Sequence, residues 1–243
     1  MKKIVVLFAT AVVAMAFAAS ASAQLSVGAG YGLASHTSKY KVGNTTTIDK
    51  PTNMNGFYVG GTYDINFLSK NWGDLSVAPG LTYSFYGKLI SSESYKDEGI
   101  NVSDKESLRE HYLDVPVHVK YAYNVVPGTL KLAAFAGPVF SFGLSSKTIM
   151  REEYGNDYTV SRLGNYSGKY VVKSSFAEDN EKGDLGDTGY SMFDLKFGFG
   201  IAATIFEKID FRIAYNVGIL DRYSSDSYSS HTNVFQIGVA YNF

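Results

Sequence analysis

The last nine residues of the chain, 235–243, read FQIGVAYNF. Large apolar side chains occupy every second position, and the chain stops on one of them: Phe235, Ile237, Val239, Tyr241 and Phe243. Successive side chains of a β-strand point to opposite faces, so this segment has one apolar face and one small or polar face. The pattern predicts a strand that runs to the final residue.

The first 23 residues read as a secretory signal peptide. Two lysines follow Met1, residues 4–18 are almost continuously apolar, and Ala21-Ser22-Ala23 is a small-x-small cleavage site. We therefore expect the mature chain to be residues 24–243. A membrane-anchoring helix is the alternative, but the apolar run is shorter than the roughly 18 residues of a spanning helix.

The composition argues against several classes of protein. The formal net charge is −1, which offers nucleic acid no basic surface. Cysteine is absent, so disulfides and thiolate chemistry are excluded. The four histidines are widely spaced and no EF-hand-like run occurs. We expect no nucleic-acid partner, no metal and no cofactor.

Eight segments alternate in the same way as the last one: residues 24–34, 56–67, 75–85, 112–123, 130–143, 193–205, 209–219 and 235–243. A soluble sheet turns its apolar face to a core and its polar face to water. Here the small face is too rich in glycine for an ordinary solvent face, and the large face is too aromatic to be left wet. An inverted sheet, with apolar groups facing lipid and small or polar groups facing a lumen, explains both faces.

These observations predict an all-β fold: a transmembrane antiparallel up-and-down β-barrel of eight strands in the outer membrane of a Gram-negative bacterium. Closure satisfies every backbone N–H and C=O in lipid. Long polar links cover residues 35–55, 88–111, 145–188 and 221–231, and short links alternate with them. In such barrels the long loops lie outside the cell and the short turns in the periplasm, which places both termini in the periplasm.

Two features of the expected strands need an explanation. Pro79, Pro116 and Pro138 lie inside them and cannot donate a ladder hydrogen bond, so we expect a bulge at each. The longest loop has two short β-like runs, residues 158–160 and 170–172, around a turn region at residues 164–168. We interpret them as a hairpin outside the membrane, and a barrel of ten strands is the alternative.

Several short motifs resemble those of one bacterial family. The run YLDVPVHVKY at residues 112–121, the AGP at residues 136–138, and Phe193-Asp194 leading into GFG at residues 198–200 resemble strands of the PorT-type, porin-family outer-membrane β-barrel proteins of Bacteroidetes. His118 departs from the family, in which an apolar residue is usual at that place. The resemblance implies the fold and the compartment, and it implies no single activity.

Charged residues of both signs fall on the small face of the strands, and they are the candidate functional set: Asp64, Asp114, Asp194 and Asp210 with Lys120, Lys131, Lys196 and Arg212. The interior of an eight-stranded barrel is just wide enough to be filled by side chains, so its charges must be paired. We interpret the set as a network that plugs the barrel. A narrow polar pore is the alternative, because the many glycines of this face could leave a cavity.

Asp114 and His118 share one face of the same strand, next to Lys120. A carboxylate that orients a histidine is half of a catalytic relay. Ser84 and Ser141 also face inward, but nothing in the sequence places either of them beside His118. We interpret His118 as a member of the lumen network, and we expect no catalytic residues and no enzyme activity.

The sequence therefore predicts a monomeric outer-membrane barrel that is porin-like or structural. A loop-based adhesin or binding protein with a plugged barrel is the first alternative, and a lipid-modifying barrel enzyme is the second. The expected partners are outer-membrane lipid and the barrel-assembly machinery, which would recognise the closing strand that ends at Phe243.

Overall fold

The protein is described by a computed structural model over residues 23–42, 45–48, 51–97, 100–156, 166–172, 191–222 and 228–243. The predicted signal peptide lies outside these ranges except for its last residue, and so does the run at residues 158–160. Within the ranges, no helix is both long enough and apolar enough to cross a membrane.

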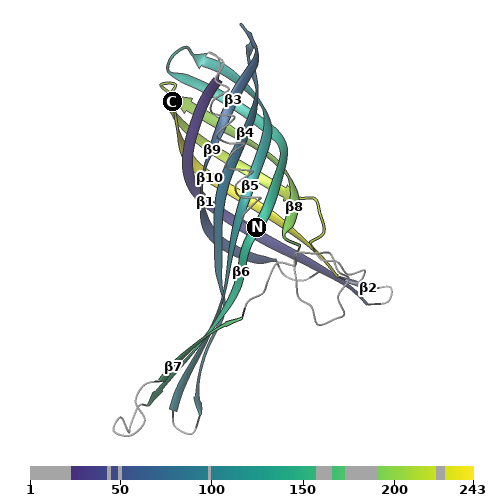
Figure 1. Cartoon of the computed structure of the whole chain (residues 1–243), viewed down its shortest axis with the longest axis vertical. Helices are drawn as coiled ribbons and strands as arrows, with labels where there is room; N and C mark the ends of the chain where they lie inside the picture. The colour runs from purple at the N-terminus through teal and green to yellow at the C-terminus, as the bar shows by residue number, and fades with distance from the viewer. Residues whose placement is uncertain are drawn as a thin grey trace.

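The described chain folds into strands joined in one sheet (Figure 1). Their bounds are β1 (Ala23–Val42), β2 (Thr45–Ile48), β3 (Thr52–Lys70), β4 (Gly73–Asp97), β5 (Ile100–Val126), β6 (Leu130–Asn156), β7 (Tyr166–Val172), β8 (Phe193–Ile205), β9 (Ile209–Gly218) and β10 (Tyr228–Asn242).

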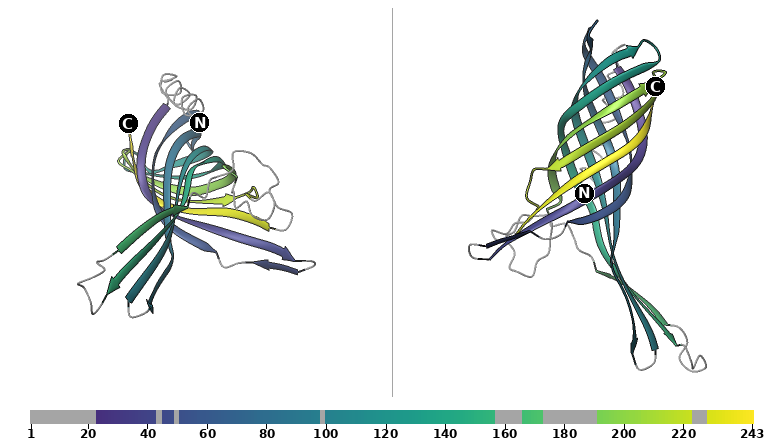
Figure 2. Two further views of the ribbon diagram at one scale, coloured as in Figure 1. Left: turned by 60° about the horizontal axis from the view of Figure 1, so that its bottom comes forward. Right: turned by 180° about the vertical axis from the view of Figure 1, so that it is seen from behind.

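The sheet closes on itself because the last strand pairs with the first (Figure 2). The ladder between β1 and β10 runs from Ser26↔Asn242 to Tyr40↔Tyr228. The ring is made of β1, β3, β4, β5, β6, β8, β9 and β10, and all of its pairings are antiparallel. The predicted eight-stranded barrel is thus confirmed, while β2 and β7 pair only with extensions of β1 and β6.

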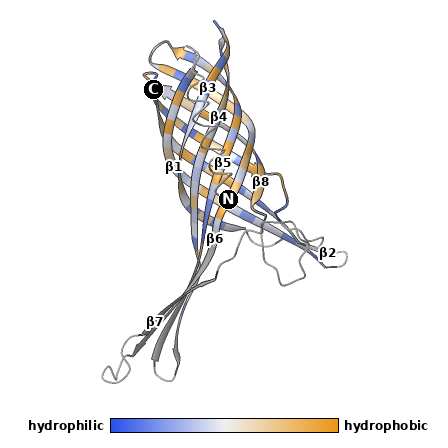
Figure 3. Cartoon of the chain, viewed as in Figure 1, coloured by the Kyte–Doolittle hydropathy of each residue, from blue (hydrophilic) through white to orange (hydrophobic). Residues whose placement is uncertain are grey.

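The predicted faces of the strands are confirmed along the whole ring. Large apolar side chains point outward and are exposed, as with Phe197, Phe199 and Ile201 on β8. The residues between them, such as Asp194 and Lys196, are buried inside. Figure 3 shows apolar positions distributed over the barrel strands. The outer wall therefore suits lipid, and the polar groups are turned to the interior.

The two ends of the barrel differ in their connections. At one end, the short-turn end, tight turns join β3 to β4, β5 to β6 and β8 to β9, and β1 begins and β10 ends. In the β8–β9 turn, Phe206 and Glu207 have φ of 52° and 59°, the left-handed conformation that tight hairpins use. At the opposite end, the long-hairpin end, β4, β5 and β6 continue beyond the ring and β7 pairs with β6 (Figure 1).

Strands β4, β5 and β6 extend far beyond the ring at the long-hairpin end, with 25, 27 and 27 residues. The predicted loop at residues 88–111 is therefore wrong in part, because β4 and β5 stay paired as far as Asp97↔Ile100. The segment is polar on both faces and shows no apolar alternation, but a backbone ladder does not need one.

The predicted hairpin within residues 145–188 needs a similar correction. Its second run belongs to β7, but β7 pairs with the extension of β6, from Thr148↔Val172 to Tyr154↔Tyr166. The alternative of ten ring strands is wrong, because the ring closes without β7.

The prolines do not produce the predicted bulges. Pairing of β4 with β5 stops after Pro79↔Val117 and resumes at Thr82↔Asp114 with unchanged register. Likewise, pairs between β5 and β6 are missing around Pro138 without a register shift. The ladder simply omits pairs where an N–H is absent, so the strand gains no extra residue.

Candidate functional site

A charged layer in the half of the lumen towards the short-turn end is built around Arg212 of β9. Its Nε and Nη2 donate to Asp210 Oδ2 at 3.1 and 2.8 Å. The guanidinium also reaches across the closure of the barrel, with Nη1 donating to Thr62 Oγ1 at 3.1 Å and Nη2 to Ser26 Oγ at 2.7 Å. Asp210 is fully buried and also accepts from Thr204 and Asn242. This Arg212 layer ties β9 to β1 and β3.

A second ion pair lies in the same half of the lumen. Lys120 Nζ donates to Asp64 Oδ2 at 2.6 Å, which joins β5 to β3 across the intervening β4. Both side chains are largely buried. Lys131 is different, because it pairs with Asp74 at 3.7 Å near the open rim, where both side chains are about a quarter exposed.

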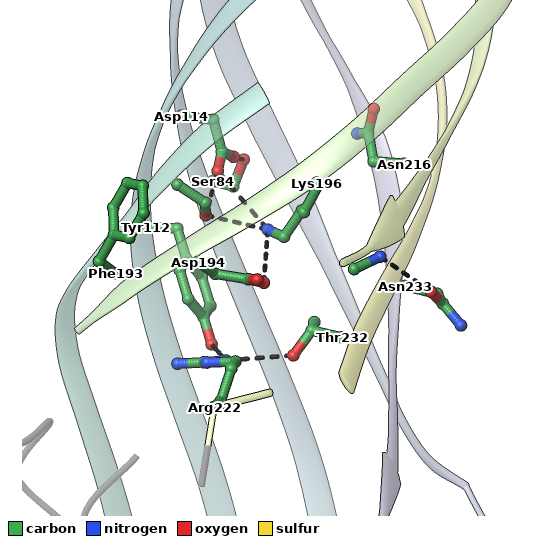
Figure 4. A network of polar contacts seen from close by, with 12 residues as sticks. Ser84, Tyr112, Asp114, Phe193, Asp194, Lys196, Asn216, Arg222, Thr232 and Asn233 are labelled. Carbon is green, nitrogen blue, oxygen red and sulfur yellow. Dashed lines mark hydrogen bonds and ion pairs between the residues drawn. The ribbon is translucent and has the colours of Figure 1, made fainter. Parts of the chain in front are cut away.

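The next layer contains Asp114, Asp194 and Lys196, in the part of the lumen nearer the long-hairpin end (Figure 4). Lys196 Nζ lies 3.7 Å from Asp114 Oδ1 and 4.0 Å from Asp194 Oδ2. Lys196 also donates to Ser141 Oγ at 2.9 Å, and Asp114 accepts from the hydroxyls of Ser84 and Ser141. The structure thus brings three predicted residues and two inward serines into one network.

Asp114 and His118, which share one face of β5, do not contact each other through a hydrogen bond in the described part of the chain. Asp114 accepts from the two serine hydroxyls instead, and His118 packs its ring against Phe135 with 5.0 Å between the centroids. His118 Nε2 is buried and has no hydrogen-bond partner in the described part of the chain. Both serine hydroxyls therefore donate to the carboxylate and neither is hydrogen-bonded to this histidine.

Sequence reasoning missed a further layer, built around Arg222, at the long-hairpin end. Arg222 follows β9 and only 2% of it is exposed. Its Nη1 donates to Tyr112 Oη at 2.8 Å and to Thr232 Oγ1 at 3.1 Å, and its Nη2 donates to the Ser191 carbonyl at 3.3 Å (Figure 4). The guanidinium therefore lies across the mouth of the barrel.

The carboxylate of the Arg222 layer is Glu110, on β5. Glu110 accepts from Tyr112 Oη at 2.6 Å and Ser146 Oγ at 3.3 Å, and its Oε2 lies 3.0 Å from His36 Nε2. His36 Nδ1 in turn lies 2.8 Å from Thr232 Oγ1. Burial alone would raise the pKa of Glu110, but His36, Arg222 and Tyr112 lower it to about 2. Glu110 lies beyond the apolar part of the outer wall, because the adjacent residue on the outward face, Arg109, is charged and exposed.

The alternation of apolar and polar residues could not predict the Arg222 layer. Arg222 lies in a predicted loop, residues 221–231, and Glu110 and His36 lie in two others. The one indirect signal was Tyr112, a large side chain on the inward face at the start of a predicted strand.

At some interior glycines, large side chains from other strands fill the space that a glycine leaves. A Cβ on Gly32 would lie 2.8 Å from Tyr86 Cε1, and one on Gly200 would lie 2.6 Å from Phe135 Cζ. Between the Arg212 and Arg222 layers a cavity of about 100 Å³ remains, lined by His118, Phe135, Asn216 and Gln236 among others. The lumen therefore has a small chamber with charged layers on both sides of it.

Solved structures that resemble this chain are bacterial outer-membrane proteins. The attachment invasion locus protein Ail of Yersinia pestis is 14% identical over 90% of this chain and 98% of its own, with a TM-score of 0.33. OprG of Pseudomonas aeruginosa is 9% identical over 91% and 96%, with a TM-score of 0.38. The protease OmpT of Escherichia coli is 9% identical over 91% and 96%, with a TM-score of 0.34. The similar structures thus include an enzyme.

No curated protein matches the chain. A family model does match it, over residues 4–243, and its description is "Outer membrane protein beta-barrel domain". The match covers every strand of the closed barrel. The chain therefore belongs to the outer-membrane β-barrel domain family, and it is an outer-membrane protein of a Gram-negative bacterium.

Proposed function

We propose that the protein is a closed structural barrel that displays a projecting β-sheet at the cell surface as a binding platform. The observation that carries the proposal is the length of β5 and β6, each of 27 residues. A transmembrane strand needs only about 9–11 residues to cross the membrane. The excess of these strands pairs with β4 and β7 in a sheet that stands clear of the ring (Figure 1).

The filled lumen supports this proposal against a pore. The Arg222 layer is buried at the long-hairpin end, and the Arg212 layer ties the opposite half together. The proposal places the long-hairpin end outside the cell and both termini in the periplasm. It also includes a monomeric barrel in contact with outer-membrane lipid, assembled through recognition of the closing strand at Phe243. A PorT-type relationship, suggested by the strand motifs, belongs to the same proposal.

The experiment compares the natural chain with a variant in which residues 90–107 are replaced by a two-residue turn. Trypsin applied to intact cells should cut the projecting sheet of the natural chain and leave the barrel protected. Producing cells should adhere to one another or to a serum-protein-coated surface, and the shortened variant should lose this adhesion while still inserting. Cleavage only in permeabilised cells, or equal adhesion by both chains, would contradict the proposal.

A narrow pore is the second candidate, and the chamber of about 100 Å³ is the observation that favours it. A pore requires the layers on both sides of the chamber to open. Release of a small sugar from liposomes that contain the natural chain would support this candidate, and retention of the sugar would support the closed barrel.

A further inference from the structure

The outer wall of the barrel carries a hollow of about 460 Å³ over β6, β8, β9 and β10. Most of its lining consists of apolar side chains that face lipid: Leu132, Ile201, Phe211, Ile213, Ile237 and Val239. The inward positions Ala133, Ala202, Arg212 and Gly238 of the same strands complete the lining. This acyl groove, as we call it, lies in the surface that the outer-membrane fold exposes to hydrocarbon. Any occupant must therefore be apolar and must come from the membrane side.

The groove exists because a small residue is surrounded by large ones. Ala203 on β8 is the cross-strand partner of Leu132 on β6 and of Phe211 on β9. Cross-strand partners share a face and lie about 4.5–5.5 Å apart. The alanine forms the floor and the two larger side chains stand on both sides of it. One acyl chain makes more apolar contact in such a depression than it makes on a flat part of the wall.

A cation lies at the short-turn end of the acyl groove. The ladder of β9 and β10 passes from Phe211↔Val239, inside the groove, to Ile209↔Tyr241, and Lys208 comes next. Lys208 is three residues before Phe211, which is about 10 Å of extended chain, so it lies beyond the short-turn end of the groove. Its Nζ lies 5.6 Å from the centroid of the Tyr241 ring, and no described carboxylate is paired with it. An exposed ammonium next to an aromatic ring at the rim suits a lipid phosphate.

We propose that the acyl groove holds one acyl chain of a phospholipid whose phosphate lies beside Lys208. The groove binds the acyl chain by apolar contact, and Lys208 binds the phosphate by charge, so both parts of the site favour a phospholipid. Bulk lipid covers the rest of the wall and exchanges freely, whereas this lipid has contacts on three sides. The site opens on the outside of the barrel and uses no residue of the projecting sheet.

The test is native mass spectrometry of the detergent-purified chain after incubation with phosphatidylglycerol, or with diacylglycerol of the same acyl chains. The natural chain should retain one phosphatidylglycerol and prefer it to diacylglycerol. Ala203→Phe should abolish retention by filling the floor of the groove. Lys208→Gln should reduce the preference for the phosphate-bearing lipid by about fivefold, the value expected for one charge near a membrane surface.

Ala136→Phe is the matched control, because Ala136 faces outward on β6 outside the groove, opposite Phe199. It should retain the lipid as the natural chain does, and circular dichroism should show that all variants are folded. Retention by Ala203→Phe equal to that of the natural chain would overturn the proposal. An unchanged preference in Lys208→Gln would overturn the position of the phosphate.

Discussion

Two inward-pointing arginines organise the lumen, and they reach it in different ways. Arg212 projects from the middle of β9 and pairs with Asp210, two residues away on the same face of the same strand. Arg222 lies beyond the end of β9, and its layer collects groups from β1, β5 and β10 through His36, Glu110, Tyr112 and Thr232. The Arg212 layer is thus held partly by one strand, whereas the Arg222 layer depends on the closed ring.

This difference predicts different costs of disruption. Arg222 and Glu110 are almost fully buried, so water cannot solvate either charge when its charged partner is removed. Arg212 is about a fifth exposed and also contacts Thr62 and Ser26, so it keeps part of its hydration and two neutral partners. We expect the Arg222 layer to be the more sensitive of the two.

The largest expected effect is therefore that of Glu110→Ala, which removes the carboxylate of the Arg222 layer. Breaking a buried charge network from one side costs about 3–5 kcal/mol of unfolding free energy. Urea unfolding in detergent, followed by the fluorescence of Trp72, the one tryptophan, measures it. Glu93→Ala, at an exposed position of the β4 extension, is the control and should change stability by less than about 0.5 kcal/mol. Equal effects of the two substitutions would contradict the buried layer.

A smaller effect is expected for Asp210→Ala in the Arg212 layer. The substitution removes the acceptor for Arg212, Thr204 and Asn242, but Arg212 keeps its two other contacts. A cost of about 1–3 kcal/mol follows from leaving buried donors without their acceptor. The same unfolding assay should place this variant between Glu110→Ala and Glu93→Ala. If Asp210→Ala lost more unfolding free energy than Glu110→Ala, the Arg212 layer would be the more sensitive one, contrary to expectation.

The difference in stability between the natural chain and Glu110→Gln, followed against pH, should report on the Arg222 layer. The pKa of Glu110 is lowered from an ordinary 4.5 to about 2 in the folded protein, so its stabilisation is complete above pH 4.5 and is lost as the pH falls towards 2. Glu110→Gln cannot titrate. The difference in unfolding free energy between the natural chain and Glu110→Gln should therefore shrink across this range. A difference that does not vary with pH would show that Glu110 is not held ionised by its neighbours.

The smallest effect is expected for Asp74→Ala at the open rim. Its partner Lys131 lies 3.7 Å away, and both side chains are partly exposed. Exposed ion pairs contribute about 0–1 kcal/mol and are screened by salt. The unfolding free energy should change little in low salt and not at all in high salt. A loss comparable to that of Asp210→Ala would mean that the rim is part of the sealed interior.

The same two arginines show how far the sequence could predict this structure. Alternation with a period of two identified all eight ring strands and the inward position of Arg212, because lipid requires every outward residue to be apolar. It could not identify the Arg222 layer, whose members lie in polar segments without alternation. It also missed the extensions of β4, β5 and β6, because their pairing depends on the backbone ladder and not on an apolar face.

The partners of the inward charges were equally beyond the sequence. The pairing of Lys120 with Asp64 joins β5 to β3 across the intervening β4, so it depends on how the sheet curves and not on one strand. Asp114 and His118 share a face on β5, but Asp114 accepts hydrogen bonds from Ser84 of β4 and Ser141 of β6 instead. Which side chains meet across the lumen depends on the relative positions of several strands, so the sequence of one strand cannot predict it.

The measurement that tests the closed barrel most directly is single-channel conductance of refolded residues 24–243 in a planar bilayer. The natural chain should show no steady current. The double variant Arg212→Ala/Arg222→Ala should show current steps, because both layers around the chamber are then weakened. Steady conductance of the natural chain would contradict the account and would make the charged layers the lining of a pore.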